Sequence, residues 1–299
     1  MFNKTAQYSC FIIICIFLIS FSCKDEQNKN KEPILKKPTV KKTVIKKGWS
    51  NFTIPGGFFK FNGKQYYYKP NKGLRFYFPR KAPKAIVILL HGWNQSMYDW
   101  SKKTGAANLA ETYGLILVTP DMGKSNYNLE YYKETKIKWS GVPGTHWIGK
   151  ILVNFLWKKL PRLPLYVIGV STGARGALMI GEHYPVFKGV GYMSGDFDIN
   201  LYKDKDKLST LYYGNFFKFE KRWWYENTRR LVQRLKAASV FVCHGHKDKT
   251  VRISQTELLI KSLEDLGIRH RAYLDKEAGH TWKYWSRRLT TAFRFWFDH

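Results

Sequence analysis

A serine between two glycines follows an apolar run in the stretch 168–176, which reads IGVSTGARG. A serine hydroxyl is a weak nucleophile unless a base takes its proton and the backbone holds its oxygen out into the open. Ser171 comes directly after LYVIGV, where a strand would end in a sharp turn. The first candidate chemistry is therefore nucleophilic attack by Ser171. This short pattern also arises by chance, so the presence of a suitable acid and base elsewhere in the chain must decide whether Ser171 is a nucleophile.

An acid and a histidine follow two later apolar runs. Asp248 lies in HGHKDKTV, directly after SVFVC, and His280 lies in AGHTW, just after HRAYLD. The imidazole of His280 would take the proton of the serine and later return it to the leaving alcohol. The carboxylate of Asp248 would hold the imidazole in one tautomer and stabilise its charged form. The chain thus carries a serine, an acid and a histidine in this order, each past a predicted strand.

Other residues compete for these roles. Asp196 and Asp198 follow the strand before Asp248 and are alternative acids. His244 and His246 lie close to Asp248 and suggest a metal site, but no further cluster of ligands supports zinc. We therefore expect Asp248 to be the acid, and we expect neither a metal nor a cofactor.

The elements that position these residues follow from alternating apolar runs and amphipathic stretches. Strands are predicted at 85–90, 115–120, 165–170, 187–193, 239–244 and 270–275. Helices are predicted near 99–113, 145–160, 173–183, 229–237 and 254–266, and from 284 onward. This alternation predicts a mostly parallel sheet with helices on both faces, which binds ligands at the carboxyl ends of its strands. Upstream, aromatic runs flank Asn62-Gly63, which predicts an antiparallel hairpin.

The segment 195–228 interrupts this alternation, because it is long, charged and rich in aromatic residues. Long connections of this kind are usually lids or binding loops. We expect most of its rings to pack the segment onto the domain, and two or three to face a cleft and contact substrate.

The serine, acid and histidine segments together resemble a known family. LLHGW, VTPD, GVSTGARGAL, HGHKDKTV and GHTWKYW are similar to the α/β-hydrolases of the putative-esterase (esterase D-like) group, from about Phe58 to the C-terminus. That group includes S-formylglutathione hydrolases, feruloyl and acetylxylan esterases, and bacterial mycolyltransferases. The resemblance implies an α/β-hydrolase fold with an aromatic-rich lid insertion, and a catalytic triad of Ser171, Asp248 and His280.

The resemblance also implies an oxyanion hole. Its donors would be the backbone N–H groups of Thr172, the residue after the nucleophile, and of Trp93 in LLHGW. His91 in the same motif is expected to be structural. Arg175 departs from the family pattern, and we expect it on the helix surface or in an ion pair, with an anionic substrate as the alternative partner.

The N-terminus predicts export. Residues 11–21 read FIIICIFLISF after Lys4 and are too few to span a bilayer, which needs about 20 apolar residues. They fit a signal peptide over 1–22. Cys23 follows it as in a bacterial lipoprotein, so we expect lipidation of Cys23, a lysine-rich tether over 23–48 and a catalytic domain over 49–299.

Charge and motifs bound the function. The chain has 51 Lys and Arg against 22 Asp and Glu, a net charge of +29, but no nucleic-acid-binding motif, so we expect no nucleic-acid partner. We expect a serine ester hydrolase that acts through an acyl-enzyme on acyl groups of polysaccharides or related esters. We expect a lipid anchor to hold it at the outer membrane or the cell surface, rather than a periplasmic or secreted location. The alternatives are a serine peptidase-like enzyme, a thioester hydrolase of the same fold and a non-catalytic glycan-binding surface lipoprotein.

Overall fold

A computed structural model describes residues 46–298 of the 299-residue chain. The predicted signal peptide, Cys23 and nearly all of the predicted tether lie outside the described residues. Within 46–298, no helix is both long enough and apolar enough to cross a bilayer.

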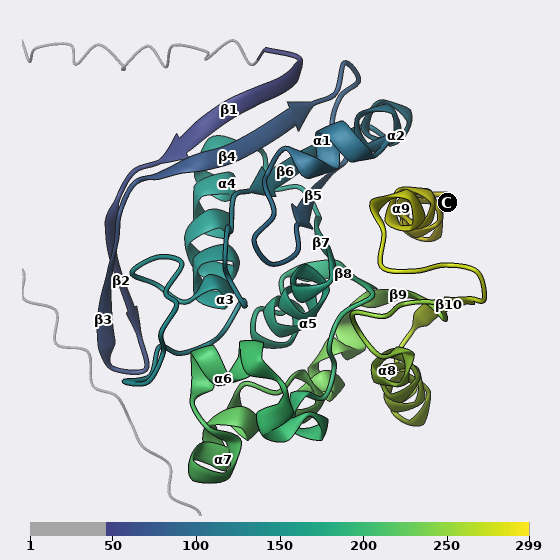
Figure 1. The fold of residues 1–299 in the computed structure, drawn as a ribbon. Helices are drawn as coiled ribbons and strands as arrows, with labels where there is room; N and C mark the ends of the chain where they lie inside the picture. The colour runs from purple at the N-terminus through teal and green to yellow at the C-terminus, as the bar shows by residue number, and fades with distance from the viewer. Residues whose placement is uncertain (1–45, 299) are drawn as a thin grey trace, which may run out of the picture. The chain divides into compact units, whose positions relative to one another are not determined.

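An eight-stranded sheet forms the centre of the fold, in the order β1-β4-β6-β5-β7-β8-β9-β10 (Figure 1). The strands β1 and β4, and the strands β4 and β6, pair antiparallel, whereas all the other neighbours are parallel. The strands of this sheet are β1 (Gly48–Ile54), β4 (Asn71–Phe78), β5 (Ala85–Leu90), β6 (Leu115–Pro120), β7 (Leu165–Val170), β8 (Phe187–Met193), β9 (Ser239–Gly245) and β10 (His270–Asp275). The mostly parallel sheet predicted from the alternation is confirmed.

A separate hairpin of β2 (Gly57–Phe61) and β3 (Lys64–Tyr68) precedes β4. Its two-residue turn has positive φ at both central residues, 46° at Asn62 and 75° at Gly63. Asn-Gly adopts this turn at little cost, so the hairpin predicted from this dipeptide is confirmed.

Helices cover both faces of the sheet. The longer α-helices are α2 (Ala106–Tyr113), α4 (Val153–Lys159), α5 (Thr172–His183), α6 (Lys207–Tyr213), α7 (Phe216–Tyr225), α8 (Ile253–Asp265) and α9 (Trp282–Phe297). The shorter α-helices are α1 (Asp99–Lys103) and α3 (Gly144–His146). Successive side chains of a strand point to opposite faces, so the all-apolar run of β5 supplies both cores. Ile86 and Ile88 belong to the core that also contains residues of α4, α5 and α8, whereas Val87 and Leu89 belong to the core on the other face, with residues of α1, α2 and α9.

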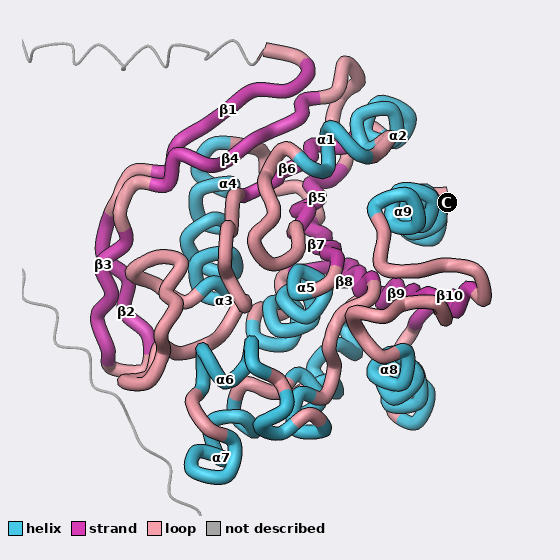
Figure 2. Tube along the Cα trace, viewed as in Figure 1, coloured by secondary structure: helices cyan, strands magenta, loops and turns pink. Residues whose placement is uncertain are grey.

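Three predicted elements differ in detail. The helix expected over 145–160 contains a π-helical stretch, Trp147–Leu152, between α3 and α4. The helix expected over 229–237 is a pair of 3-10 turns, Thr228–Arg230 and Val232–Ala237. The segment 195–228 is largely helical, with α6 and α7 within it, as Figure 2 shows. Local hydrogen-bond spacing of this kind depends on packing and leaves little trace in a pattern of apolar residues.

Candidate active site

Ser171 occupies a strained turn between β7 and α5. Its backbone angles are φ 56° and ψ −127°, a region that non-glycine residues seldom adopt and that costs about 1–3 kcal/mol. Glycines permit the tight corner: a Cβ on Gly169 would come within 2.1 Å of the carbonyl oxygen of Gly173, and a Cβ on Gly173 within 2.6 Å of that of Leu90. The turn has the geometry of a nucleophile elbow, which exposes a serine hydroxyl at the carboxyl end of a strand.

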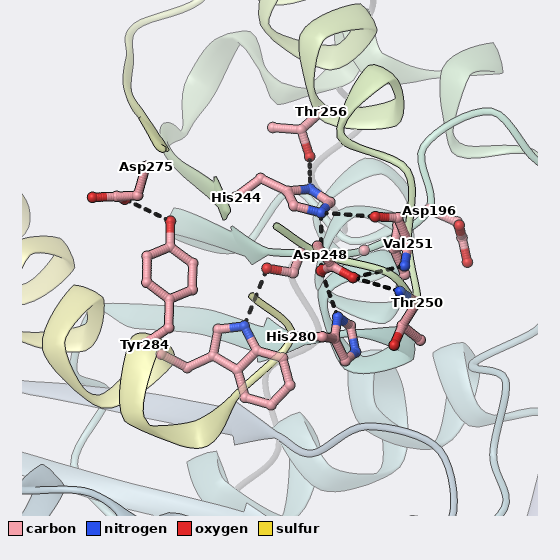
Figure 3. A network of polar contacts seen from close by, with 12 residues as sticks. Asp196, His244, Asp248, Thr250, Val251, Thr256, Asp275, His280 and Tyr284 are labelled. Carbon is pink, nitrogen blue, oxygen red and sulfur yellow. Dashed lines mark hydrogen bonds and ion pairs between the residues drawn. The ribbon is translucent and has the colours of Figure 1, made fainter. Parts of the chain in front are cut away.

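Asp248 and His280 come together at the same edge of the sheet. Asp248 follows β9 and His280 follows β10, the neighbouring parallel strand. The Nδ1 atom of His280 lies 2.6 Å from Oδ2 of Asp248, as Figure 3 shows. The ring of His280 also meets the edge of Trp285, with 4.8 Å between ring centroids, which fixes its plane. Since the Nδ1–H of a neutral His280 donates to Asp248, its Nε2 atom is left as a base.

Asp248 is held as a carboxylate. Its Oδ1 atom accepts the backbone N–H groups of Thr250 and Val251 at 2.8 and 2.9 Å. Burial alone would raise the pKa of Asp248, but hydrogen bonds from His244, His280 and the Val251 N–H lower the pKa well below its ordinary value. The group is therefore charged throughout the physiological range.

His244 is a second histidine on the same carboxylate. Its Nε2 atom lies 3.0 Å from Oδ2 of Asp248, and its Nδ1 atom lies 2.5 Å from the hydroxyl of Thr256 (Figure 3). The ring is fully buried. A neutral ring that donates from Nε2 and accepts at Nδ1 satisfies both contacts. Sequence reasoning missed this role, although the i, i+4 spacing of His244 and Asp248 in HGHKD was a usable signal.

The rival acids hydrogen-bond to other partners, although Asp196 lines the same pocket as Ser171 and His280. Asp198 is buried and accepts from Asn227 and Arg229, at 2.7 and 2.9 Å. Asp196 accepts the hydroxyl of Tyr202 at 2.8 Å, and burial raises the pKa of Asp196. Among residues 46–298, Asp248 alone of these three carboxylates makes a hydrogen bond or ion pair with His280.

A single pocket of about 480 Å³ brings the predicted residues together. Ser171, Thr172, Trp93 and His280 all line it. Among residues 46–298, no hydrogen bond of 3.5 Å or less joins the Ser171 hydroxyl to His280. Catalytic hydrogen bonds of this kind are often long before substrate binds. The pocket therefore brings the predicted nucleophile, the predicted base and both residues of the predicted oxyanion hole together.

The backbone around Trp93 is oriented by His91. The buried ring of His91 accepts the N–H of Met122 at Nε2, at 2.8 Å, which leaves its Nδ1–H to donate to the carbonyl of Gly92, at 2.7 Å. A trans peptide directs its N–H opposite to its carbonyl, so this bond fixes the direction of the Trp93 N–H. In the described chain no hydrogen bond uses the N–H of Trp93 or Thr172.

The segment 195–228 covers one side of this pocket. Tyr202 lines the pocket, whereas Tyr213, Phe216 and Trp223 form a separate small core with Tyr212. The indole N–H of Trp93 donates to the Tyr212 hydroxyl at 3.0 Å, which ties the segment to the loop after β5. The structure thus buries five of the ten rings of this segment, and Tyr202 alone of these ten lines the pocket, instead of the two or three rings expected.

Arg175 is buried, which contradicts the expected surface position. Its side chain is 1% exposed, and it forms no ion pair within the described chain. Its guanidinium donates to the backbone carbonyls of Asn126 and Glu226, each at 2.5 Å. Arg175 therefore joins α5 to two other segments at the floor of the pocket that it lines.

The comparisons with known proteins place this chain in a family. Residues 68–296 match the family described as "Putative esterase", so the chain belongs to this family. It is an ester hydrolase of the serine class, in agreement with the resemblance found in the sequence. A comparison with curated proteins finds no match.

Solved structures share the fold. A fluorophosphonate-binding serine hydrolase of Staphylococcus aureus has a TM-score of 0.62 at 15% identity, over 84% of this chain and 99% of that one. An S-formylglutathione hydrolase of Agrobacterium tumefaciens has 0.62 at 16% identity, over 82% and 98%. A ferulic acid esterase has 0.58 at 16% identity, over 85% and 99%. The α/β-hydrolase fold predicted from the sequence is confirmed.

Proposed function

We propose that the chain hydrolyses esters through an acyl-enzyme on Ser171, and that its substrates carry acyl groups on polysaccharides or related alcohols. The observation that carries this proposal is the 2.6 Å contact between His280 and Asp248 beside a pocket that Ser171 also lines. The strained backbone of Ser171 supports it, because strain of this kind clusters at functional sites.

The first half of the reaction forms the acyl-enzyme. The Ser171 hydroxyl oxygen attacks the carbonyl carbon while its proton moves to Nε2 of His280. The N–H groups of Trp93 and Thr172 stabilise the negative oxygen, and each donor of this kind can be worth about 3 kcal/mol. The tetrahedral intermediate then expels the alcohol, which takes the proton from His280.

The second half releases the acid. Water attacks the acyl carbon, gives its proton to His280, and Ser171 leaves with that proton. Asp248 stays ionised through both halves, which agrees with its lowered pKa. Its negative charge stabilises the imidazolium that forms twice in each cycle.

The choice of substrate rests on the solved structures that share the fold and on the residues that line the pocket. A ferulic acid esterase shares the fold, and the segment 195–228 adds Tyr202 and charged side chains to the pocket. An S-formylglutathione hydrolase also shares the fold, so a thioester is the second candidate. The same serine, base and oxyanion donors serve either leaving group.

Export to the cell envelope is a further part of the proposal and rests on the sequence. The run 11–21 ends just before Cys23, and lysines follow it. Lipidation of Cys23 would anchor the enzyme to the outer membrane or the cell surface. Metabolic labelling with a radioactive fatty acid tests this: label in the wild type that is absent from Cys23→Ser supports the anchor, and label in neither refutes it.

The reaction itself is tested with a panel of substrates. It contains p-nitrophenyl acetate, acetylated and feruloylated oligosaccharides, an S-acyl thioester and a peptide. We expect turnover of one or more oxygen esters, with the highest kcat/KM on an oligosaccharide ester, and none by Ser171→Ala. Unchanged turnover by Ser171→Ala, or cleavage of the peptide alone, would overturn the proposal.

A further inference from the structure

A second and larger hollow lies next to the active-site pocket. It has a volume of about 840 Å³, within the range of about 300–1,000 Å³ usual for small-molecule sites. It is lined by β3, by the backbone after β6 and by the loop before α3. The reaction proposed above makes no use of it, because Ser171 and His280 line the other pocket.

Three aromatic residues line this hollow: Tyr67, Trp139 and the buried Trp147. The indole of Trp139 is fixed in place, because its N–H donates to the Asp121 carbonyl at 3.2 Å and its ring meets the edge of Trp147 at 5.2 Å. Tyr67, on β3, is 52% exposed. The loop and the strand are in close contact, since a Cβ on Gly141 would come within 1.8 Å of the Tyr67 carbonyl. Trp139 thus presents a ring that is already held in place, which lowers the entropy cost of binding, and Tyr67 adds an exposed ring to the same lining.

Charged groups surround the rings of Trp139 and Tyr67. Lys69 and Lys138 are exposed side chains that line the hollow. The carboxylate of Asp121 also lines it and is 42% exposed. Aromatic faces carry negative potential and attract the C–H groups of a sugar ring, a carboxylate accepts from sugar hydroxyls, and ammonium groups attract anions. These groups together fit a sugar that bears a negative charge.

The hollow and the active-site pocket share a wall. The N–H of Asn94, next to Trp93, donates to the carbonyl of Gly123 at 2.8 Å. Trp93 and Asn126 line the active-site pocket, whereas Asp121 and Gly123 line the hollow. A ligand that fills both sites therefore passes the loop that holds Trp93 and Asn94, and its ester bond would lie near Ser171.

We propose that this hollow binds an acidic saccharide, the uronate-bearing part of the alcohol whose acyl group enters the active-site pocket. This inference rests on the proposed function for its substrate, but the binding does not require catalysis. Trp139 and Tyr67 would contact the faces of the sugar rings, Asp121 would accept from hydroxyl groups, and Lys69 and Lys138 would pair with the uronate carboxylates.

The test measures binding by the full-length Ser171→Ala protein, which cannot turn over a ligand. Calorimetry compares trigalacturonate with the same trisaccharide methyl-esterified at its carboxylates. We expect the acid form to bind at least about tenfold more tightly, a difference of about 1.4 kcal/mol. We expect this preference to fall in about 1 M NaCl, where the Debye length is about 3 Å.

Variants locate the site. Tyr67→Ala and the double variant Lys69→Ala/Lys138→Ala should each weaken binding of trigalacturonate about fivefold to tenfold. The matched controls are Trp224→Ala and Lys236→Ala, which should leave the binding of trigalacturonate unaltered. Trp224 is an aromatic residue of α7 that is 49% exposed, and Lys236 is an exposed lysine on a 3-10 turn. At Trp139 the variant to use is Trp139→Phe, because it keeps an aromatic ring, whereas Trp139→Ala would risk the packing on Trp147.

Three results would overturn the inference: no binding of either trisaccharide, equal binding of both, or equal losses in the matched variants. Each is independent of the proposed function. A protein that hydrolyses esters but fails these tests remains an esterase whose hollow has another role. A protein that binds the acid trisaccharide through Tyr67 and the lysines but hydrolyses no ester refutes the proposed function alone.

Discussion

Replacing Arg175 tests whether this residue supports the fold or contacts the substrate. Arg175→Met keeps most of the side-chain volume but removes both hydrogen bonds to the carbonyls of Asn126 and Glu226. Hydrogen bonds that involve a charged group are worth about 1.5–3 kcal/mol each, and both carbonyls would stay buried without these donors. We therefore expect the free energy of unfolding to fall by about 3–5 kcal/mol.

The assay is thermal unfolding followed by circular dichroism, with KM for one neutral and one carboxylate-bearing ester measured alongside. For a domain of this size each kcal/mol lowers Tm by about 2–4 °C, so we expect a loss of about 10 °C. Arg175→Lys keeps the charge but cannot reach both carbonyls in the same geometry, so its loss should be about half as large. Arg271→Met, at an exposed position on β10, is the control and should leave Tm nearly unchanged.

A substrate contact would give the opposite pattern. If Tm stayed within about 2 °C of the wild type and KM rose for the carboxylate-bearing ester alone, Arg175 would be a ligand for the substrate. The structural role argued from its two carbonyl contacts would then be wrong.

Three further predictions concern the polar groups around Asp248. Asp248→Asn should lower kcat about 10³–10⁴-fold with little change in KM, because it favours the wrong tautomer of His280; a loss under about tenfold in steady-state kinetics would contradict this. His244→Phe should lower kcat about tenfold to a hundredfold, because it removes one donor to that carboxylate. The kcat of this variant should also depend on pH differently from that of the wild type. The control Thr256→Val should change kcat less. Because the pKa of Asp248 is lowered in the folded state, its contribution to stability is present above pH about 4 and is lost as the pH falls further. Urea unfolding should show the stability difference between wild type and Asp248→Asn shrinking below that pH, and a constant difference would refute the linkage.

The sequence predicts the sheet and the ends of its strands well. Runs such as AIVILL are apolar at every position because β5 is buried on both faces, so length and flanking turns were enough to identify them. Ser171, Asp248 and His280 are predicted for the same reason, since the carboxyl ends of neighbouring parallel strands meet at one edge. The Asn62-Gly63 turn is a local signal that needs no tertiary contact.

Arg175 shows where such reasoning ends. A charged residue in the first turn of a helix is ordinarily exposed, but Thr172 to Glu182 are all buried in α5. The carbonyls that accept from Arg175 come from residues 49 positions upstream and 51 positions downstream, and no local pattern announces them. The contacts of His244 and the hollow beside Trp139 depend in the same way on long-range packing.

The most direct test of the central claim is to trap the acyl-enzyme. The full-length protein is treated with a fluorophosphonate, digested, and mapped by mass spectrometry, and a slow ester substrate is quenched and mapped in parallel. We predict one adduct on the hydroxyl of Ser171 with both reagents, and none in Ser171→Ala. An adduct on another residue, or ester turnover by Ser171→Ala at the wild-type rate, would contradict the account.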